Sequence, residues 1–381
     1  MNTRIVEPVS PASSFVFTLR EWGSRIRHSQ SRRAIRNRAG QLTITQSTAP
    51  LLNYGCLEDT ASSDTLPIGG QIKLIPLSAK FPAHPDRFNI IYLVSSALPP
   101  HAEEIVAAAK KRGARLVWNQ NGIAYPGCYG DYYAWFNTRM AALRAQADFI
   151  LNQSEFSRVG AERYLGPSAA PSEICLNPVD TGIFTPTKSP LSQEPWEILA
   201  AGTSHALYRT QSALDTLRLL LKRGRPARLT IAGEFRWKNA AAEVRQAMEG
   251  IREHVTILPP FRQSEAPGIY RRAHVLLHTK YNDPCPTVPI EAMSCGLPVA
   301  GTHSGGMPEL VSRESGILVP VPQSWTRDLA GEPADLADAV EGIMQNHAAM
   351  SRAAREHAVR TFDVGRWLAR HEAVFRQVLT S

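Results

Sequence analysis

The chain has 381 residues, of which 43% are hydrophobic, so it is long enough for two medium-sized domains that each bury a core. Its longest apolar run, around Ile90–Val94, is far shorter than the roughly 18 residues that a membrane-spanning helix needs. The formal net charge is +8, but residues 1–38 hold eight arginines against Glu7 and Glu21 and therefore supply most of it. This local excess argues against a nucleic-acid-binding surface, and we predict no nucleic acid partner.

The N-terminal residues 1–45 form a basic segment in which aromatic residues are mixed with the arginines of residues 14–38. Such a pattern predicts an element that meets an anionic membrane surface, and the alternative is a solvated arginine-rich tail. Prolines and Glu7 precede any hydrophobic stretch, so we expect no secretory signal. The five cysteines are scattered without a Cys-x-x-Cys pair, which fits reduced thiols. We therefore predict a cytoplasmic protein that is peripheral on the inner face of the membrane.

From Leu51 onward, short apolar runs alternate with helical patterns, which is typical of repeated β-α units and a parallel sheet. The first half predicts strands in residues 51–55, 88–96, 115–122, 147–154 and 172–180. Helices are expected in residues 71–81, where Pro76 weakens the pattern, and in 101–113, 132–147 and 154–166. Ser154 is suited to cap the last of these helices and Gly166 to end it. We assign residues 46–186 to an N-terminal Rossmann-like acceptor domain.

A proline-rich stretch at the midpoint of the chain predicts an interdomain linker, residues 187–195. The alternation then resumes, with strands expected in residues 196–204, 227–234, 254–260, 274–280, 297–302 and 316–320. Helical patterns occupy residues 210–224, 239–251, 266–273, 289–296, 308–314 and 334–362. Residues 196–363 are therefore assigned to a C-terminal Rossmann-like nucleotide domain, and the helix in residues 364–381 is expected to pack back on the N-terminal domain.

The segment that follows residues 274–280 contains two acidic residues, Asp283 and Glu291. In an open parallel sheet, ligands bind beyond the carboxyl ends of the strands, so chemistry is expected in this loop. Thr287 can cap a helix that begins here, and the free N–H groups of Thr287 and Val288 would then bind a diphosphate. One carboxylate can reach the sugar of a sugar nucleotide, while the other accepts hydrogen bonds from ribose hydroxyls. The alternative is that Asp283 caps a turn and Glu291 complements the helix dipole.

Residues 283–311, DPCPTVPIEAMSCGLPVAGTHSGGMPELV, resemble the donor-binding signature of retaining family 4 glycosyltransferases, in which an acidic residue and a glutamate are separated by seven residues. Residues 176–186, LNPVDTGIFTP, are similar to the N-G-V-D-x-x-x-F-x-P segment of the same family, with Pro178 in place of the glycine. The resemblance implies an α/β chain of the GT-B class, in which two Rossmann-like doubly wound domains face each other across a cleft.

The resemblance also implies a set of site residues. Asp283 and Arg209 are the expected catalytic residues, with Arg209 at the position of a family lysine that clamps the diphosphate. The expected donor-binding residues are Glu291, Pro286, Thr287, Val288, Gly69, Gly70 and Thr203. The acceptor-side loop carries Asn119, Gln120 and Asn121 where relatives have a histidine, and we expect acceptor contacts from Asn121 and Tyr125.

The expected function is retaining transfer of a sugar from a UDP- or GDP-sugar donor to a glycan or lipid-linked acceptor, in cell-envelope or exopolysaccharide synthesis. No general base is required, because enzymes of this kind are thought to deprotonate the acceptor with the departing phosphate. His278 and His303 lack a second ligand at helical spacing, so neither a metal nor another cofactor is predicted. The alternatives are a sugar-nucleotide epimerase on the same fold and a non-catalytic nucleotide-sugar-binding subunit.

Overall fold

The fold is that of a computed structural model, which describes residues 4–5, 37–57, 70, 72–188 and 191–381. The described residues divide into two compact units. Residues 37–57, 70, 72–125, 129–176 and 365–381 make up the N-terminal unit, and residues 4–5, 126–128, 177–188 and 191–364 make up the C-terminal unit. The predicted membrane-facing segment lies outside the described residues except for residues 37–38.

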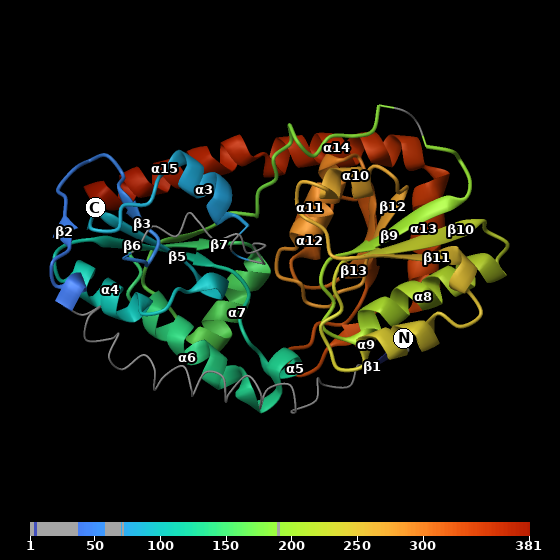
Figure 1. Cartoon of the computed structure of the whole chain (residues 1–381), viewed down its shortest axis with the longest axis horizontal. Helices are drawn as coiled ribbons and strands as arrows, with labels where there is room; N and C mark the ends of the chain where they lie inside the picture. The colour runs from blue at the N-terminus through green and yellow to red at the C-terminus, as the bar shows by residue number, and fades with distance from the viewer. Residues whose placement is uncertain (1–3, 6–36, 58–69, 71, 189–190) are drawn as a thin grey trace. The chain divides into compact units, whose positions relative to one another are not determined.

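The N-terminal unit is built on a five-stranded parallel sheet in which the strands follow one another in chain order (Figure 1). Its strands are β3 Leu52–Asn53, β5 Ile90–Val94, β6 Arg115–Gln120, β7 Phe149–Asn152 and β8 Ser172–Ile174. The short strands β2 Thr43–Ile44 and β4 Arg87–Phe88 form a separate parallel pair. All residues of β5 and β7 are buried, as expected for inner strands of a sheet covered on both faces.

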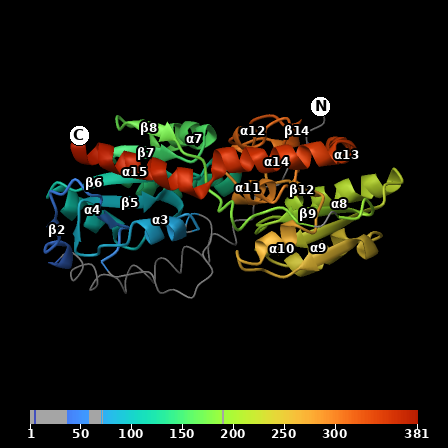
Figure 2. The same cartoon turned by 90° about the horizontal axis from the view of Figure 1, so that it is seen from above.

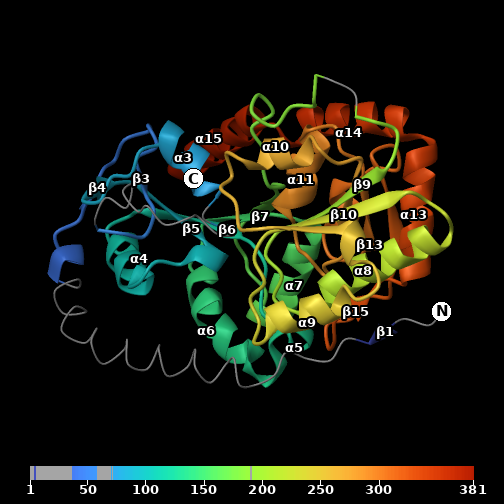
Figure 3. The same cartoon turned by 45° about the vertical axis from the view of Figure 1, so that its right-hand side comes forward.

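Helices cover both faces of this sheet. They are α3 Leu74–Lys80, α4 Ala102–Lys110, α6 Tyr133–Arg144, α7 Glu155–Leu165 and α15 Val364–Thr380. The short α5 Pro126–Tyr129, which precedes α6, belongs mostly to the C-terminal unit. Apolar side chains of α3 and α15 pack with Tyr92 and Val117 on one face, and Figure 2 shows α15 lying along the sheet. On the other face, α4 and α6 pack with Leu93 and Trp118 (Figure 3). The C-terminal helix is therefore part of the N-terminal core.

The C-terminal unit contains a six-stranded parallel sheet with the order β11-β10-β9-β12-β13-β14. Its strands are β9 Trp196–Ala201, β10 Ala227–Ala232, β11 Val255–Leu258, β12 Val275–His278, β13 Val299–His303 and β14 Gly316–Pro320. A separate antiparallel pair joins β1 Arg4–Ile5 to β15 Leu329–Ala330. The order of the six strands is the one that characterises dinucleotide-binding folds, and it reverses direction between β9 and β12.

The helices of this unit are α8 Leu207–Lys222, α9 Ala240–Ala247, α10 Ala266–Tyr270, α11 Thr287–Ser294, α12 Met307–Leu310, α13 Pro333–Gln345 and α14 His347–Phe362. Leucines of α8 and α13 pack with Ile198 and Leu277 in the main core of the unit. Figure 1 shows α10, α11 and α14 gathered on the opposite side of the sheet. Among the described residues, no helix is both long enough and apolar enough to cross a membrane.

Two local expectations need correction. The strand predicted in residues 172–180 ends at Ile174, and the chain from Asn177 onward belongs to the C-terminal unit because it packs around α11. Thr287 does not cap α11, because the helix begins with Thr287 and Pro286 occupies the cap position without a side-chain acceptor. Pro76 lies in the first turn of α3, where a missing N–H costs no intrahelical hydrogen bond.

Candidate functional site

The candidate site lies in the C-terminal unit, where the strand order reverses between β9 and β12. Connections that leave the sheet in opposite directions at such a point open a crevice at the strand ends. The loop after β9 passes through Gly202, whose φ of +99° is strained for other residues. A Cβ atom on Gly233, after β10, would lie 2.7 Å from the carbonyl oxygen of Gly202. Glycine at both positions therefore lets the two loops approach closely.

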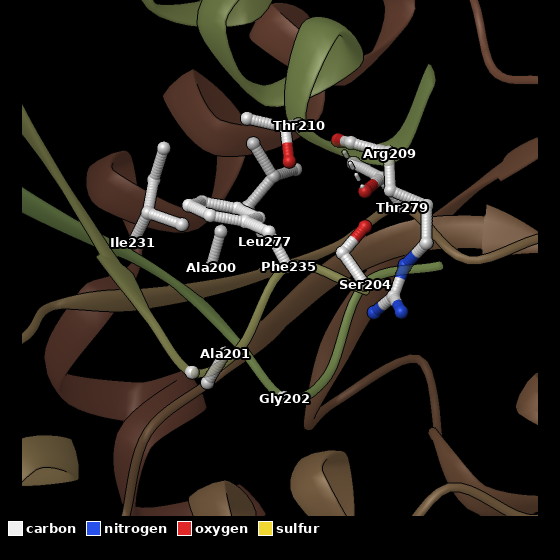
Figure 4. Close-up of a pocket in the computed structure, with 11 residues that line it drawn as sticks. Ala200, Ala201, Gly202, Ser204, Arg209, Thr210, Ile231, Phe235, Leu277 and Thr279 are labelled. Atoms are coloured by element: carbon white, nitrogen blue, oxygen red, sulfur yellow. Dashed lines mark hydrogen bonds between the residues drawn. The ribbon is translucent and has the colours of Figure 1, made fainter. Parts of the chain in front are cut away.

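A pocket opens at these strand ends (Figure 4). Figure 4 shows the apolar side chains of Ala200, Ile231 and Phe235 grouped on one side and the polar side chains of Ser204, Arg209 and Thr279 on the other. The remaining lining residues are Ala201, Gly202, Thr210, Gly233 and Leu277. The pocket thus has one apolar wall and one polar wall that carries a cation.

Arg209 is presented by the first turn of α8. Its Nη1 atom donates to the carbonyl oxygen of Thr203 at 2.5 Å, while its Nε atom has no hydrogen-bond partner within the described part of the chain. Burial lowers the pKa of Arg209, and Asp283 opposes this shift. Because an arginine pKa starts far above neutrality, the guanidinium keeps its charge. Thr203 thus contributes its backbone to the site by orienting the cation.

Asp283 lies in the loop after β12 and is held by two neighbours. Its Oδ2 atom lies 3.1 Å from Lys280 Nζ and 3.5 Å from His278 Nε2. Burial would raise the pKa of Asp283, but Lys280, His278 and Arg209 together hold it well below its usual range. Burial is also the main reason that the pKa of His278 is lowered, so this histidine is neutral at pH 7. The site therefore holds a carboxylate that is ionised at neutral pH.

The turn that follows β13 contacts the backbone of the loop that contains Asp283. The N–H of Gly306 donates to the carbonyl oxygen of Asp283 at 2.8 Å. Gly305 has a φ of +61°, and a Cβ atom there would lie 2.4 Å from the same oxygen. Only glycine permits this approach without displacing the loop.

Helix α11 begins directly after the Asp283 loop. Because Pro286 offers no capping side chain, the first N–H groups of the helix, at Thr287 and Val288, have no side-chain cap. The Val288 side chain lies beside Gly202, at ordinary van der Waals distance from where a Cβ would stand. The helix N-terminus, with its partial positive charge, therefore lies next to the loop after β9 and can bind an anion.

Glu291 is buried one turn further along α11. Its Oε2 atom accepts a hydrogen bond from the Tyr270 hydroxyl at 2.8 Å, and its Oε1 atom accepts one from Gln263 Nε2 at 3.2 Å. Burial raises the pKa of Glu291 to about 7, although both hydrogen bonds lower it. The carboxylate is thus engaged by side chains rather than by the helix terminus.

The site residues predicted in the first half of the chain belong to the N-terminal unit. Gly69 lies outside the described residues, whereas Gly70 packs against Ser96 and Asn121. The Asn121 side chain accepts from Lys73 Nζ at 2.6 Å and donates to Ser96 Oγ at 2.7 Å. Tyr125 is buried. Their roles toward a ligand stay predictions.

Sequence reasoning missed Lys280, Tyr270 and Gln263, and it weighed His278 for metal binding or acid-base chemistry without assigning it a role. Lys280 was open to prediction, because it stands three residues before Asp283 in the same loop. Tyr270 and Gln263 come from a segment more than 20 residues away, and no local pattern connects them with Glu291. Within the described residues, no group of three or more His, Cys, Asp or Glu side chains is placed to hold a metal ion.

Residues 197–346 match the sequence profile of the family described as glycosyl transferases group 1. The D-inositol 3-phosphate glycosyltransferase of Streptomyces bingchenggensis is 31% identical over 163 residues, which are 42% of this chain and 33% of that protein. The match thus spans about a third of the length of this relative.

Solved structures match over most of the chain. The Anabaena protein HepE in complex with UDP-glucose has a TM-score of 0.64 at 16% identity, covering 89% of this chain and 98% of that one. Sucrose-phosphate synthase from Thermosynechococcus elongatus has a TM-score of 0.60 at 17% identity, covering 81% of this chain and 77% of that one. At such identities the likeness concerns the fold. The chain therefore has the GT-B fold, and its residues 197–346 match the glycosyl transferases group 1 family.

Proposed function

We propose that the chain is a retaining glycosyltransferase that moves a sugar from a UDP- or GDP-sugar donor to a glycan or lipid-linked acceptor. The observation that carries this proposal is the meeting of an ionised Asp283, the cation of Arg209 and the uncapped N-terminus of α11 at one strand-order reversal. The likeness to HepE, whose structure contains UDP-glucose, supports a sugar-nucleotide donor.

In this proposal the donor diphosphate binds at the N-terminus of α11. The N–H groups of Thr287 and Val288 donate to its oxygens, and the helix dipole favours its charge. Arg209 adds a fixed cation, which stabilises the negative charge that develops on the leaving nucleotide as the glycosidic bond breaks. Glu291 accepts hydrogen bonds from the ribose hydroxyls.

Asp283 has a different role from that of a general acid. A carboxyl group whose pKa is held well below the usual range cannot keep a proton to donate at neutral pH. Its oxygens instead accept hydrogen bonds from the sugar and fix the orientation of the anomeric carbon. This division of work fits a reaction in which the departing phosphate takes the proton of the acceptor hydroxyl and the new bond forms on the same face of the sugar.

The acceptor is assigned by chemical class alone, as a glycan or a lipid-linked acceptor of cell-envelope or exopolysaccharide synthesis. Asn121 and Tyr125 are the residues proposed to contact it, and no metal or other cofactor is required. Binding of the basic residues 14–38 to an anionic membrane at the cytoplasmic face is part of the same proposal. Vesicles with and without anionic lipid test it, because removal of residues 1–38 should abolish salt-sensitive binding.

The test of the reaction is an incubation with sugar nucleotides and a panel of glycan and lipid-linked acceptors. Nucleoside diphosphate release that depends on the acceptor, and a product whose anomeric configuration matches that of the donor by NMR, are the expected results. A new sugar nucleotide formed from donor alone would identify an epimerase. Donor binding without turnover with any acceptor of the panel would favour a non-catalytic binding subunit.

A further inference from the structure

The Glu291 side chain is held in place by hydrogen bonds from Tyr270 and Gln263, two residues outside helix α11. Only 6% of the residue is exposed, and each of its two carboxylate oxygens accepts one side-chain hydrogen bond, from Tyr270 or from Gln263. A carboxylate has about four acceptor positions, so two remain for other donors. Glu291 is therefore held in place while its carboxylate keeps acceptor positions for further hydrogen bonds.

The Tyr270 hydroxyl has little freedom to move. Tyr270 is the last residue of α10 and is 1% exposed, and its ring packs against that of Phe184 with 6.2 Å between centroids. Phe184 is itself tied to α11, because its carbonyl oxygen accepts from Ser294 Oγ and from Arg355 Nη1, both at 2.7 Å. Phe184 thus packs against Tyr270 and restricts its ring, and the Tyr270 hydroxyl in turn donates to Glu291.

We propose that Tyr270, assisted by Gln263, is a positioning residue that aims the Glu291 carboxylate at the ribose of the bound nucleotide and makes nucleotide binding depend on the ionisation of Glu291. The inference rests on the proposed function, since it takes the ligand to be a ribonucleoside diphosphate. Glu291 must accept two hydroxyl donors, and it does so fully only as a carboxylate.

The electrostatic surroundings of Glu291 support a response near neutral pH. Burial raises its pKa to about 7. The other titratable groups in the cluster are the Tyr270 hydroxyl, whose pKa lies well above its usual value, and the Cys295 thiol, whose pKa burial raises to about 12. The Arg271 and Arg355 guanidinium groups oppose the rise in the pKa of Cys295. In this cluster of described residues, Glu291 is the group that titrates between pH 6 and 8.

The direct test compares wild-type protein with Tyr270→Phe, which keeps the ring and removes only the hydroxyl. UDP, GDP and ADP are titrated calorimetrically, and the tightest binder is followed from pH 5.5 to 8.5 together with its 2′-deoxy form. Wild-type affinity should rise with pH through a midpoint near 7. In Y270F the midpoint should move up by roughly one pH unit, because a hydrogen bond that favours the carboxylate is lost. The preference for ribose over 2′-deoxyribose should shrink.

Two further variants separate the possible failures. Tyr92→Phe removes the hydroxyl of another buried, hydrogen-bonded tyrosine in the N-terminal unit and should leave the midpoint unchanged. Glu291→Gln should weaken binding of the ribonucleotide and remove the contribution of Glu291 to the pH dependence, leaving only that of the terminal phosphate of the nucleotide, whose pKa is about 6. If E291Q does so while Y270F behaves as wild type in midpoint and ribose preference, the positioning role of Tyr270 is wrong and the proposed function stands. If E291Q binds like wild type, or no nucleotide binds, the proposed function itself fails.

Discussion

The two units share a parallel sheet between layers of helices, yet they use the carboxyl ends of their strands differently. In the C-terminal unit the strand order reverses, and Arg209 lines a pocket at the point of reversal. In the N-terminal unit the five strands run in sequential order, and the polar side chains at the ends of β5 and β6 bind one another. Polar groups at the carboxyl ends of the strands thus line a pocket in the C-terminal unit and hydrogen-bond with each other in the N-terminal unit.

The network in the N-terminal unit is continuous and buried. Lys73 Nζ donates to the side-chain oxygens of Asn119 and Asn121 at 3.0 and 2.6 Å. Asn119 Nδ2 donates to the Tyr92 hydroxyl at 2.8 Å, and that hydroxyl lies 3.0 Å from His371 Nε2 on α15. Burial lowers the pKa of His371 to about 3, with Lys73 acting in the same direction. The N-terminal unit therefore contains a buried histidine, His371, with a lowered pKa, whereas the C-terminal unit contains a buried carboxyl group, Glu291, with a raised pKa.

Replacing Asp283 should have the largest effect on activity. Asp283→Ala removes the ionised acceptor from the site, and we expect transfer to fall by roughly 100- to 1000-fold, as on loss of one preorganised electrostatic contact. The matched control is Asp338→Asn, which removes an exposed carboxylate of the same unit that pairs with Arg223. If D283A kept full activity in the acceptor-dependent assay, the assignment of the catalytic site to the Asp283 loop would be wrong.

The two units should respond to pH in opposite directions. The folded pKa of Glu291 is raised, so its contribution to stability is present below pH 4.5 and is lost as the pH rises through about 7. His371 has a depressed folded pKa, so its contribution is present above pH 6.5 and is lost as the pH falls toward about 3. Each group should change the free energy of unfolding by about 1.4 kcal/mol per pH unit inside its window.

Hydrogen exchange between pH 5 and 7 measures these opposite changes in stability. Peptides from β5 and β6 report on the stability of the N-terminal unit, and peptides from β9 and β12 report on that of the C-terminal unit. Glu291→Gln should flatten the slope of the C-terminal unit alone, and His371→Gln that of the N-terminal unit alone. If the unfolding free energies of both units changed with pH in the same direction, and neither variant altered this, Glu291 and His371 would not be the cause of the pH response of either unit.

Arg209→Ala should weaken nucleotide binding by roughly tenfold to a hundredfold, since it removes a charge-assisted contact of about 1.5–3 kcal/mol. Calorimetric titration with the preferred nucleoside diphosphate measures the loss. Lys222→Ala removes an exposed cation from the far end of the same helix and serves as its control. Equal affinities of R209A and K222A would leave the cation without a role in binding.

Lys73→Met should have the smallest and most local effect. Two buried amide oxygens lose their donor, which we expect to cost about 1–3 kcal/mol of unfolding free energy in urea titrations. The surface variant Lys80→Met breaks an exposed pair with Glu372 and should cost less than about 1 kcal/mol. Nucleotide affinity should stay at the wild-type value in both, and a loss in K73M comparable to that of R209A would contradict the separation of the two units.

The sequence by itself was sufficient for features that depend on neighbours in the chain. Alternating apolar runs predicted the parallel sheets. Helix α7 begins after Ser154 and ends before Gly166 as expected, and Ser154 Oγ accepts a hydrogen bond from the Ser157 N–H at 3.0 Å. The Asp283 and Glu291 spacing also placed one carboxylate in a loop and the other in the helix that follows. Local conformational preferences and short-range hydrogen bonds decide all of these.

Only the tertiary structure decided how each carboxylate is held. Asp283 is ionised because His278, Lys280 and Arg209 converge on it from a strand, a loop and a helix, while Glu291 is buried against Tyr270 from another helix. The expected cap at Thr287 was wrong for a related reason, since the cap depends on the backbone path through Pro286. Desolvation and charge both act through space, so two acidic residues eight positions apart acquire opposite pKa shifts that no spacing in the sequence encodes.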